Sequence, residues 1–267
     1  ANSEQLDWKK IEEQRSGAFL VYGHRAPRAW ISEDETLGRA FLQYANDNLP
    51  GAWDNWRSLK REPNNPIELL LVAECLADQG SDGVLPYLDR LQKNYPTEAL
   101  AIRARLLWRK NRVEEARRVM SDALVSLQAD PWPLQALITR TIDLTVEMVE
   151  SATATAATKS IYEALQKPFA VYNSDEDRMF ALMRVGINLD NGPTGEHVLR
   201  SIEAAEPHVP WNLGFLEIRN TCYAASQHPR AERAENDLID YLLAEPEKLE
   251  GPSSTSIKPL RIANAAK

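Results

Sequence analysis

Two runs of carboxylates are the first residues of this sequence that could do chemistry, because paired carboxylates can transfer protons or bind a cation. The runs are Glu33-Asp34-Glu35 and Asp175-Glu176-Asp177, and each directly follows a serine, Ser32 or Ser174. Both open a helical pattern, where acidic side chains complement the positive end of the helix dipole. Ser32 and Glu35 also have the spacing of a capping box. We therefore predict helix starts, rather than reaction sites, at both runs.

Residues that bind metals or act as nucleophiles are few and scattered. The four histidines are His24, His197, His208 and His228. No two of them have the i, i+4 spacing of a helical metal site. Cys75 and Cys222 lie in helical patterns and favour free buried thiols, which suit a reducing compartment. The sequence has no Gly-rich phosphate loop, no Gly-x-Ser-x-Gly elbow and no His-Glu-x-x-His. It therefore predicts no catalytic residue, metal or cofactor, and the alternative is an enzyme with an unfamiliar site.

A basic stretch is the strongest candidate for binding. Residues 101–118 hold seven Lys or Arg against two Glu, although the whole chain has a net charge of −8. Arg103 and Arg105 fall on different faces of one predicted helix, so the cations cannot all join one patch. The alternatives are a solvated surface and a groove that grips an acidic peptide or a C-terminal carboxylate through charge-assisted hydrogen bonds.

Tryptophans are a second kind of candidate, because aromatic side chains anchor interfaces as well as filling gaps between packed helices. Several of the seven recur near the predicted ends or starts of helices. The predicted partner-binding residues are Arg103, Arg105, Trp108, Arg109, Trp132, Arg140, Trp211 and Arg219. The partner they imply is a protein or peptide, with an acidic one as a candidate.

Composition and charge narrow the classes of function. The chain has 267 residues, of which 43% are hydrophobic and 26% charged, as in an ordinary globular protein. It has only 11 Gly, and this low glycine content favours helices. The net charge of −8 disfavours nucleic-acid binding through a basic face. No apolar run approaches the ~20 residues of a membrane span, so no insertion of this segment is expected. Because the chain begins with Ala1 rather than Met, we expect a processed product or a piece of a longer protein.

The candidate residues lie on a continuous series of predicted helices, from Ser32 to about residue 244, broken about every 12–20 residues by Pro, Gly or Asn. The helices pair as 34–48 with 51–61, 66–79 with 83–94, 97–110 with 112–128, 133–149 with 154–167, 176–190 with 194–205, and 211–227 with 229–244. Each second helix carries an apolar triplet: Ala52/Trp56/Leu59, Val84/Leu88/Leu91, Ala116/Met120/Ala123, Ala157/Ile161/Ala164, Val198/Ile202/Ala205 and Ala234/Leu238/Tyr241. Successive triplets are 32, 32, 41, 41 and 36 residues apart, which is close to the ~33–45-residue periods of helical solenoids.

Residues 97–128 resemble a tetratricopeptide repeat (TPR). In that family a small residue marks where the first helix crosses the second, and the second carries an Ala–aromatic–Ala set. The matching residues here are Leu100, Ala104 and Leu107, then Ala116, Met120 and Ala123, and the first-helix theme returns at Leu69/Ala73/Leu76 and Leu182/Gly186/Leu189. The family's first-helix Trp and Tyr are absent, so the chain is TPR-like. The resemblance spans about 32–244 and implies an all-α, right-handed α-solenoid of about six helical hairpins that binds a protein in a groove lined by its first helices.

The segments on either side of the repeat region are predicted to differ from it. Residues 18–22 read as one strand in an extended N-terminal arm, residues 1–31, and the Pro and Gly content of residues 245–267 favours a flexible tail. Residues 17–31 also resemble a domain boundary in bacterial membrane proteins that fuse a transporter-like region to a spermidine-synthase-like domain. That resemblance implies a soluble regulatory or structural tail of a membrane-bound protein. The expected location is the cytoplasm, free or tethered to a membrane, with the periplasm as the alternative.

Overall fold

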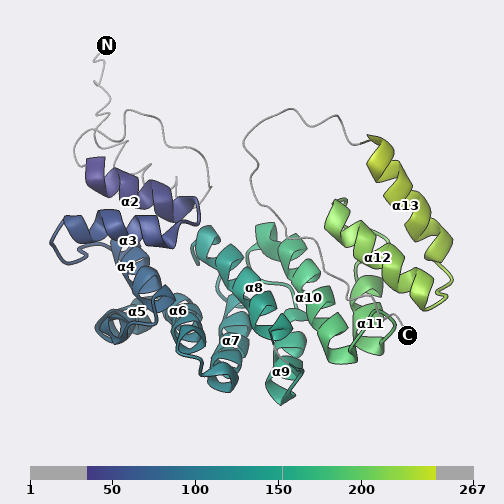
Figure 1. Cartoon of the computed structure of the whole chain (residues 1–267), viewed down its shortest axis with the longest axis horizontal. Helices are drawn as coiled ribbons and strands as arrows, with labels where there is room; N and C mark the ends of the chain where they lie inside the picture. The colour runs from purple at the N-terminus through teal and green to yellow at the C-terminus, as the bar shows by residue number, and fades with distance from the viewer. Residues whose placement is uncertain (1–34, 152, 245–267) are drawn as a thin grey trace, which may run out of the picture.

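The computed structural model describes residues 35–151 and 153–244, and all regular structure in these ranges is helical (Figure 1). The α-helices are α2 (Glu35–Ala45), α3 (Leu49–Ser58), α4 (Pro66–Asp78), α5 (Leu85–Asn94), α6 (Pro96–Arg109), α7 (Val113–Leu127), α8 (Gln135–Glu150), α9 (Ala156–Leu165), α10 (Asp175–Asp190), α11 (Glu196–Glu203), α12 (Leu213–Ala225) and α13 (Ala231–Ala244). Two short 3-10 helices are η2 (Asp82–Val84) and η3 (Tyr172–Ser174). The all-α prediction is therefore confirmed. The predicted arm, its strand, the Ser32 capping box, the resemblance at 17–31 and the tail lie outside the described residues.

Local capping explains where several helices begin. Asn65 accepts a hydrogen bond from the amide of Glu68, and Pro66 occupies the first turn of α4, where its missing N–H is not needed. In α3 the cap is Asn48, so the helix begins two residues before the predicted position 51. The acidic run at Asp175 does lie in the first turn of α10, as predicted.

One turn recurs at the ends of five first helices. A residue with positive φ follows each of α2, α4, α6, α10 and α12, and these residues are Asp47, Gly80, Asn111, Asn191 and Gln227. In each case the amide of the next residue donates to the carbonyl five positions earlier, which satisfies a carbonyl at the helix end. The turns are 33, 31, 80 and 36 residues apart. A geometric repeat therefore accompanies the repeat of apolar triplets at these five helices.

Consecutive helices other than α8 and α9 pack as neighbours, in an open arc that runs from α2 and α3 to α12 and α13 (Figure 1). Five predicted pairs are in direct contact: α2–α3, α4–α5, α6–α7, α10–α11 and α12–α13. The fourth pair differs from the prediction, because α9 packs against α7 and α10 rather than against α8. The prediction of regular hairpins therefore fails at this step of the array.

The apolar triplets form much of the core, since fifteen of their eighteen side chains are buried and only Leu59, Leu238 and Tyr241 are partly exposed. The small residues predicted at helix crossings, Ala73, Ala104 and Gly186, are buried or lie at a close approach. A Cβ added to Gly186 would lie 2.9 Å from the backbone of Val198, so only glycine lets α10 and α11 come this close. Within the described residues, no helix has the length and hydropathy needed to span a membrane.

Candidate partner-binding surface

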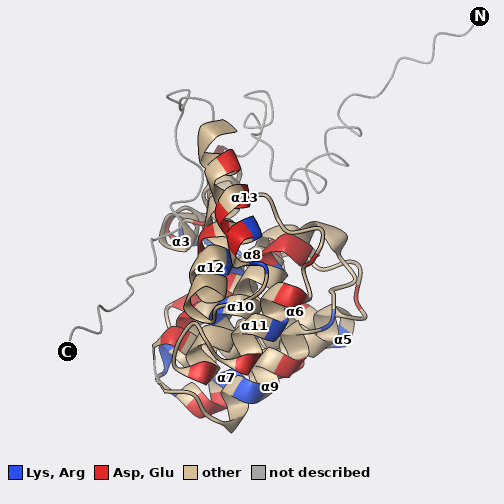
Figure 2. Ribbon diagram, turned by 90° about the vertical axis from the view of Figure 1, so that its right-hand side faces the viewer, with Lys and Arg blue, Asp and Glu red and all other residues tan. Residues whose placement is uncertain are grey.

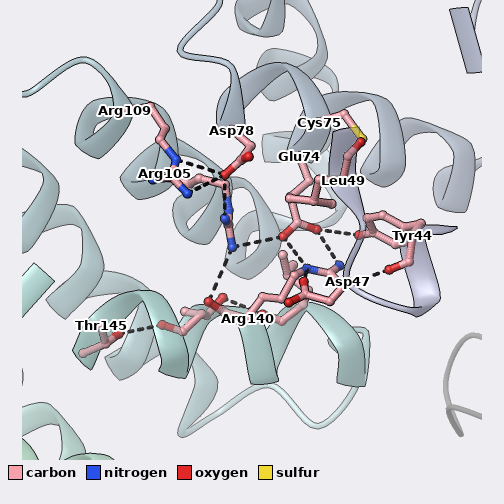
Figure 3. Close-up of polar contacts among 12 residues, drawn as sticks. Tyr44, Asp47, Leu49, Glu74, Cys75, Asp78, Arg105, Arg109, Arg140 and Thr145 are labelled. Atoms are coloured by element: carbon pink, nitrogen blue, oxygen red, sulfur yellow. Dashed lines mark hydrogen bonds and ion pairs between the residues drawn. The ribbon is translucent and has the colours of Figure 1, made fainter. Parts of the chain in front are cut away.

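A buried ion pair joins helices that are far apart in the sequence. Arg140 on α8 donates from Nε and Nη2 to the two carboxylate oxygens of Glu74 on α4, at 2.8 and 2.7 Å. The Tyr44 hydroxyl on α2 donates to Glu74 Oε2 at 2.6 Å, and Arg140 Nη1 donates to the Tyr44 carbonyl at 3.1 Å (Figure 3). Glu74 and Tyr44 are fully buried and Arg140 nearly so. The pair therefore holds three first helices together and offers no surface to a partner.

The network continues through α6. Arg105 Nη1 lies 2.9 Å from Asp78 Oδ1, and Arg105 Nη2 lies 3.4 Å from Glu74. Arg109 donates from Nε and Nη2 to the same Asp78 oxygen at 3.0 and 2.9 Å (Figure 3). Its Nη1 also lies 3.5 Å from Glu147 on α8. These arginines are thus occupied by carboxylates of their own chain.

The electrostatics of the network favour its charged form. Burial raises the pKa of Glu74, but Arg140 and Arg105 more than offset this, so the pKa lies below its usual value. Burial and Glu74 raise the pKa of Tyr44 well above its usual value, which keeps its hydroxyl protonated as a donor. Burial also raises the pKa of Cys75 to about 12, and its Sγ contacts the Leu49 carbonyl at 3.4 Å. A buried carboxylate fixed as an acceptor, beside a protonated thiol, is suited to holding helices rather than to catalysis.

Two further arginines are used inside the chain. Arg219 on α12 is fully buried and binds Glu206 Oε1 at 2.9 Å and Asp237 Oδ2 of α13 at 2.6 Å. Arg117, from the basic stretch, is also buried and donates to the Met148 carbonyl near the end of α8 at 2.7 Å. Much of the basic stretch therefore fastens one helix to another. The sequence had offered two other interpretations, a solvated surface and a groove for an acidic peptide.

The remaining predicted binding residues lie at three places in the array: on α6, between α7 and α8, and before α12. Arg103 is exposed on α6, on the face opposite the buried Arg105, as the helical period predicts. Trp108, near the end of α6, is half-buried and donates from Nε1 to Glu147 at 3.0 Å. Trp132, between α7 and α8, is 87% exposed, and Trp211, before α12, is 52% exposed. Arg103 and Trp108 share α6, whereas Trp132 and Trp211 lie elsewhere in the array, and the prediction that the four bind a partner stays a prediction.

An acidic surface that the sequence analysis missed lies on α8 and α10. Its members are exposed, and we name them the acidic face: Asp143, Glu147, Glu150, Glu176 and Asp177. Burial raises the pKa of Asp143, and the neighbouring charges of Asp177 and Asp47 raise it further. Burial and Glu176 raise the pKa of Asp177. The ionised forms of Asp143 and Asp177 are therefore disfavoured, whereas Glu147 and Glu150 face Arg109 at 3.5 Å and Arg184 at 2.6 Å. The spacing of Asp143, Glu147 and Glu150 was visible in the sequence, but only the packing of α8 on α10 brings both helices' acids together.

A cavity of about 310 Å³ lies between α3 and α4, with Trp53 and Cys75 among its lining residues. Its charged side chains already have partners. Asp54 pairs with Arg57 at 3.1 Å, and Asp78 belongs to the network described above. The cavity therefore presents no unpartnered charge to a ligand.

Two of the three histidines in the described ranges, His197 and His228, each pair with one carboxylate. His197 Nδ1 lies 2.7 Å from Asp190, and His228 Nε2 lies 3.1 Å from Glu203. Neither histidine lines the cavity. Burial raises the pKa of Cys222 to about 12, as for Cys75, so neither thiol is poised as a thiolate. No group of three or more His, Cys, Asp or Glu in the described part of the chain is placed to hold a metal ion.

Comparisons of the chain with family models, with curated proteins and with solved structures found no match. Only the helical array and its surfaces bear on the function of the chain.

Proposed function

We propose that this protein is a non-catalytic, TPR-like scaffold, a right-handed helical-repeat array that binds a segment of a partner protein. The observation that carries the proposal is the serial packing of helix pairs, five of which end their first helix with the same left-handed turn. Because each unit of such an array contacts mainly its neighbours, its first helices keep narrow exposed stripes side by side. An extended peptide that crosses several stripes is the kind of ligand that this geometry fits.

The charges favour a basic partner segment that lies across the acidic face. Desolvation and nearby carboxylates raise the pKa values of Asp143 and Asp177, although both side chains are exposed. A Lys or Arg of a partner would offset that repulsion and gain charge-assisted hydrogen bonds. The arginines that would favour an acidic partner are mostly bound within the chain, with Arg103 and Arg118 as exposed exceptions. A basic segment is therefore better matched to the surface than an acidic one.

The test uses fluorescence anisotropy with a short labelled peptide rich in Lys and Arg, and with its Glu-rich counterpart. We expect the basic peptide to bind the full chain and the double variant Asp143→Asn/Asp177→Asn to bind it roughly tenfold more weakly at low salt, since each exposed pair contributes up to about 1 kcal/mol. Raising the salt concentration should narrow the difference in affinity between the native chain and the double variant, because exposed charges are screened.

The matched control is Asp122→Asn/Glu163→Gln, which removes two exposed charges from the second helices α7 and α9. This variant should bind the basic peptide as the native chain does. An equal loss in both double variants would show nonspecific attraction to net negative charge and would count against the acidic face. Binding of only the Glu-rich peptide, lost in Arg103→Glu, would restore the acidic partner expected from the sequence.

A further inference from the structure

The last helix of the described array has an uncovered apolar side. Ile239, Leu242 and Leu243 on α13 are 45%, 52% and 80% exposed, and we name these three side chains the end face. The opposite side of α13 packs on α12 through residues that include the fully buried Ala234. Three exposed aliphatic side chains in one turn and a half of helix are more than a solvated helix face needs.

The position of α13 explains why this side is uncovered. In the interior of the array each second helix also packs against a later helix, as α7 does with α9 and α9 with α10. The helix α13 packs mainly against α12 and has no later helix in the described residues. Its C-terminal turns project from the end of the array (Figure 1). Repeat arrays need a covered or polar surface at their ends, so something should cover the end face.

We propose that residues 257–262 of the same chain, Ile-Lys-Pro-Leu-Arg-Ile, cover the end face, and we name them the cap segment. The segment supplies three aliphatic side chains, Ile257, Leu260 and Ile262, to match the three on α13. It also carries two cations, Lys258 and Arg261, and no acidic residue.

Charge complementarity favours this occupant. The exposed charged residues of α13 are Glu232, Arg233, Glu235 and Asp240, which leaves an acidic surface beside the end face. Figure 2, which looks at this end of the array, shows acidic positions along α13. A second copy of α13 would instead bring like charges together, and three side chains offer far less than the ~800 Å² per partner of a stable dimer. The cap segment meets the same apolar surface with the opposite charge.

The connecting residues are long enough to allow the contact. Residues 245–256 join α13 to the cap segment, and a flexible chain of this length spans about 20 Å, at ≈ 5–6 Å × √n. A helix of 14 residues such as α13 is about 21 Å long, so the cap segment can reach any part of it. Because the contact is intramolecular, an effective concentration in the millimolar range keeps even a weak contact formed.

Hydrogen exchange with mass spectrometry on the full chain tests the proposal. The variant Leu260→Asp/Ile262→Asp alters only the cap segment, so it leaves every residue of the array unchanged. We expect amide exchange over residues 235–244 to become about tenfold faster in this variant, because the cover is lost. The matched control, Ala265→Asp/Ala266→Asp, adds the same charge just beyond the cap segment and should exchange as the native chain does.

Three results would overturn the proposal. Identical exchange in the native chain and both variants would show that the cap segment does not cover α13. Equal acceleration in both variants would show a general effect of added negative charge. Protection that rises with protein concentration, together with a doubled mass in light scattering, would assign the end face to a second copy of the chain.

Discussion

Two buried arginines fasten the two ends of the array, but they act over different distances along the chain. Arg140 binds Glu74, 66 positions away, and the Tyr44 carbonyl, 96 positions away. Arg219 binds Glu206 and Asp237, only 13 and 18 positions away. The N-terminal part, α2 to α8, is therefore tied together across several helix pairs, whereas the C-terminal part depends on contacts between neighbours. The first arrangement favours cooperative unfolding, and the second allows the end to open by itself.

The largest expected effect comes from breaking the long-range network with Glu74→Ala. The substitution leaves Arg140 buried without its carboxylate and Tyr44 without its acceptor, which costs about 3–5 kcal/mol of unfolding free energy. Urea denaturation should show the loss, and hydrogen exchange should accelerate together in α2, α4, α6 and α8.

The matched variant is Arg219→Ala at the other end of the chain. It should accelerate exchange mainly in α12 and α13, because its partners Glu206 and Asp237 are local. If Arg219→Ala loosened α2 to α6 as well, or if Glu74→Ala disturbed α4 alone, the contrast between the two ends would be lost.

The helices were predictable because their signals are local. Asn65, Pro66 and Gly80 bracket α4 within one stretch of sequence, and each predicted helix overlaps an observed one. The opposite faces of Arg103 and Arg105 followed from the helical period alone. What the sequence could not supply was the partner of each buried charge. Arg105 looked available to a ligand because nothing in residues 101–118 marks Glu74 and Asp78 as its partners.

The same distinction applies to the irregular step of the array and to the acidic face. The second helix α9 has a regular triplet, yet it packs on α7 and α10 instead of α8, since side-chain spacing does not specify which neighbour a helix chooses. The acidic face needs α8 and α10 side by side, so Asp143 and Asp177 could be grouped only after the fold was known. Long-range pairing was the information that the sequence lacked in both cases.

A medium effect is expected at the crossing of α10 and α11, in the locally held part of the chain. In Gly186→Ala the new Cβ would lie 2.9 Å from the Val198 backbone. Overpacking of about 1–3 kcal/mol should exceed the roughly 1 kcal/mol that Ala gains in helix propensity, so the variant should be less stable. Thermal unfolding measures this, and exchange should accelerate in α10 and α11 before α4.

Gly192→Ala is the control for this crossing, because a Cβ there meets nothing within 4 Å. Its stability should stay within about 0.5 kcal/mol of the native chain. Equal stability of the two alanine variants would mean that α10 and α11 can move apart at little cost in free energy. The C-terminal part would then be less tightly packed than the structure indicates.

The smallest expected effect concerns pH, at the junction where α8 meets α10. Asp143 has a raised pKa in the folded chain, so its ionised form is disfavoured there and its contribution to stability grows as pH falls through that pKa. Glu74 has a lowered pKa, so its contribution is present above the usual glutamate pKa and is lost as pH falls through the folded value. Asp143→Asn should therefore raise stability at neutral pH by a few tenths of a kcal/mol, since solvent screens an exposed group.

Urea titrations at neutral and mildly acidic pH separate the two contributions. The advantage of Asp143→Asn over the native chain should shrink as the native Asp143 becomes protonated. A variant that lost stability at neutral pH would mean that the Asp143 carboxylate is held by a favourable contact, and the repulsion across the α8–α10 junction would then be too weak to attract a basic partner. The junction between the two parts of the array would in that case be an attachment point of the fold rather than the open acidic surface on which the proposed function depends.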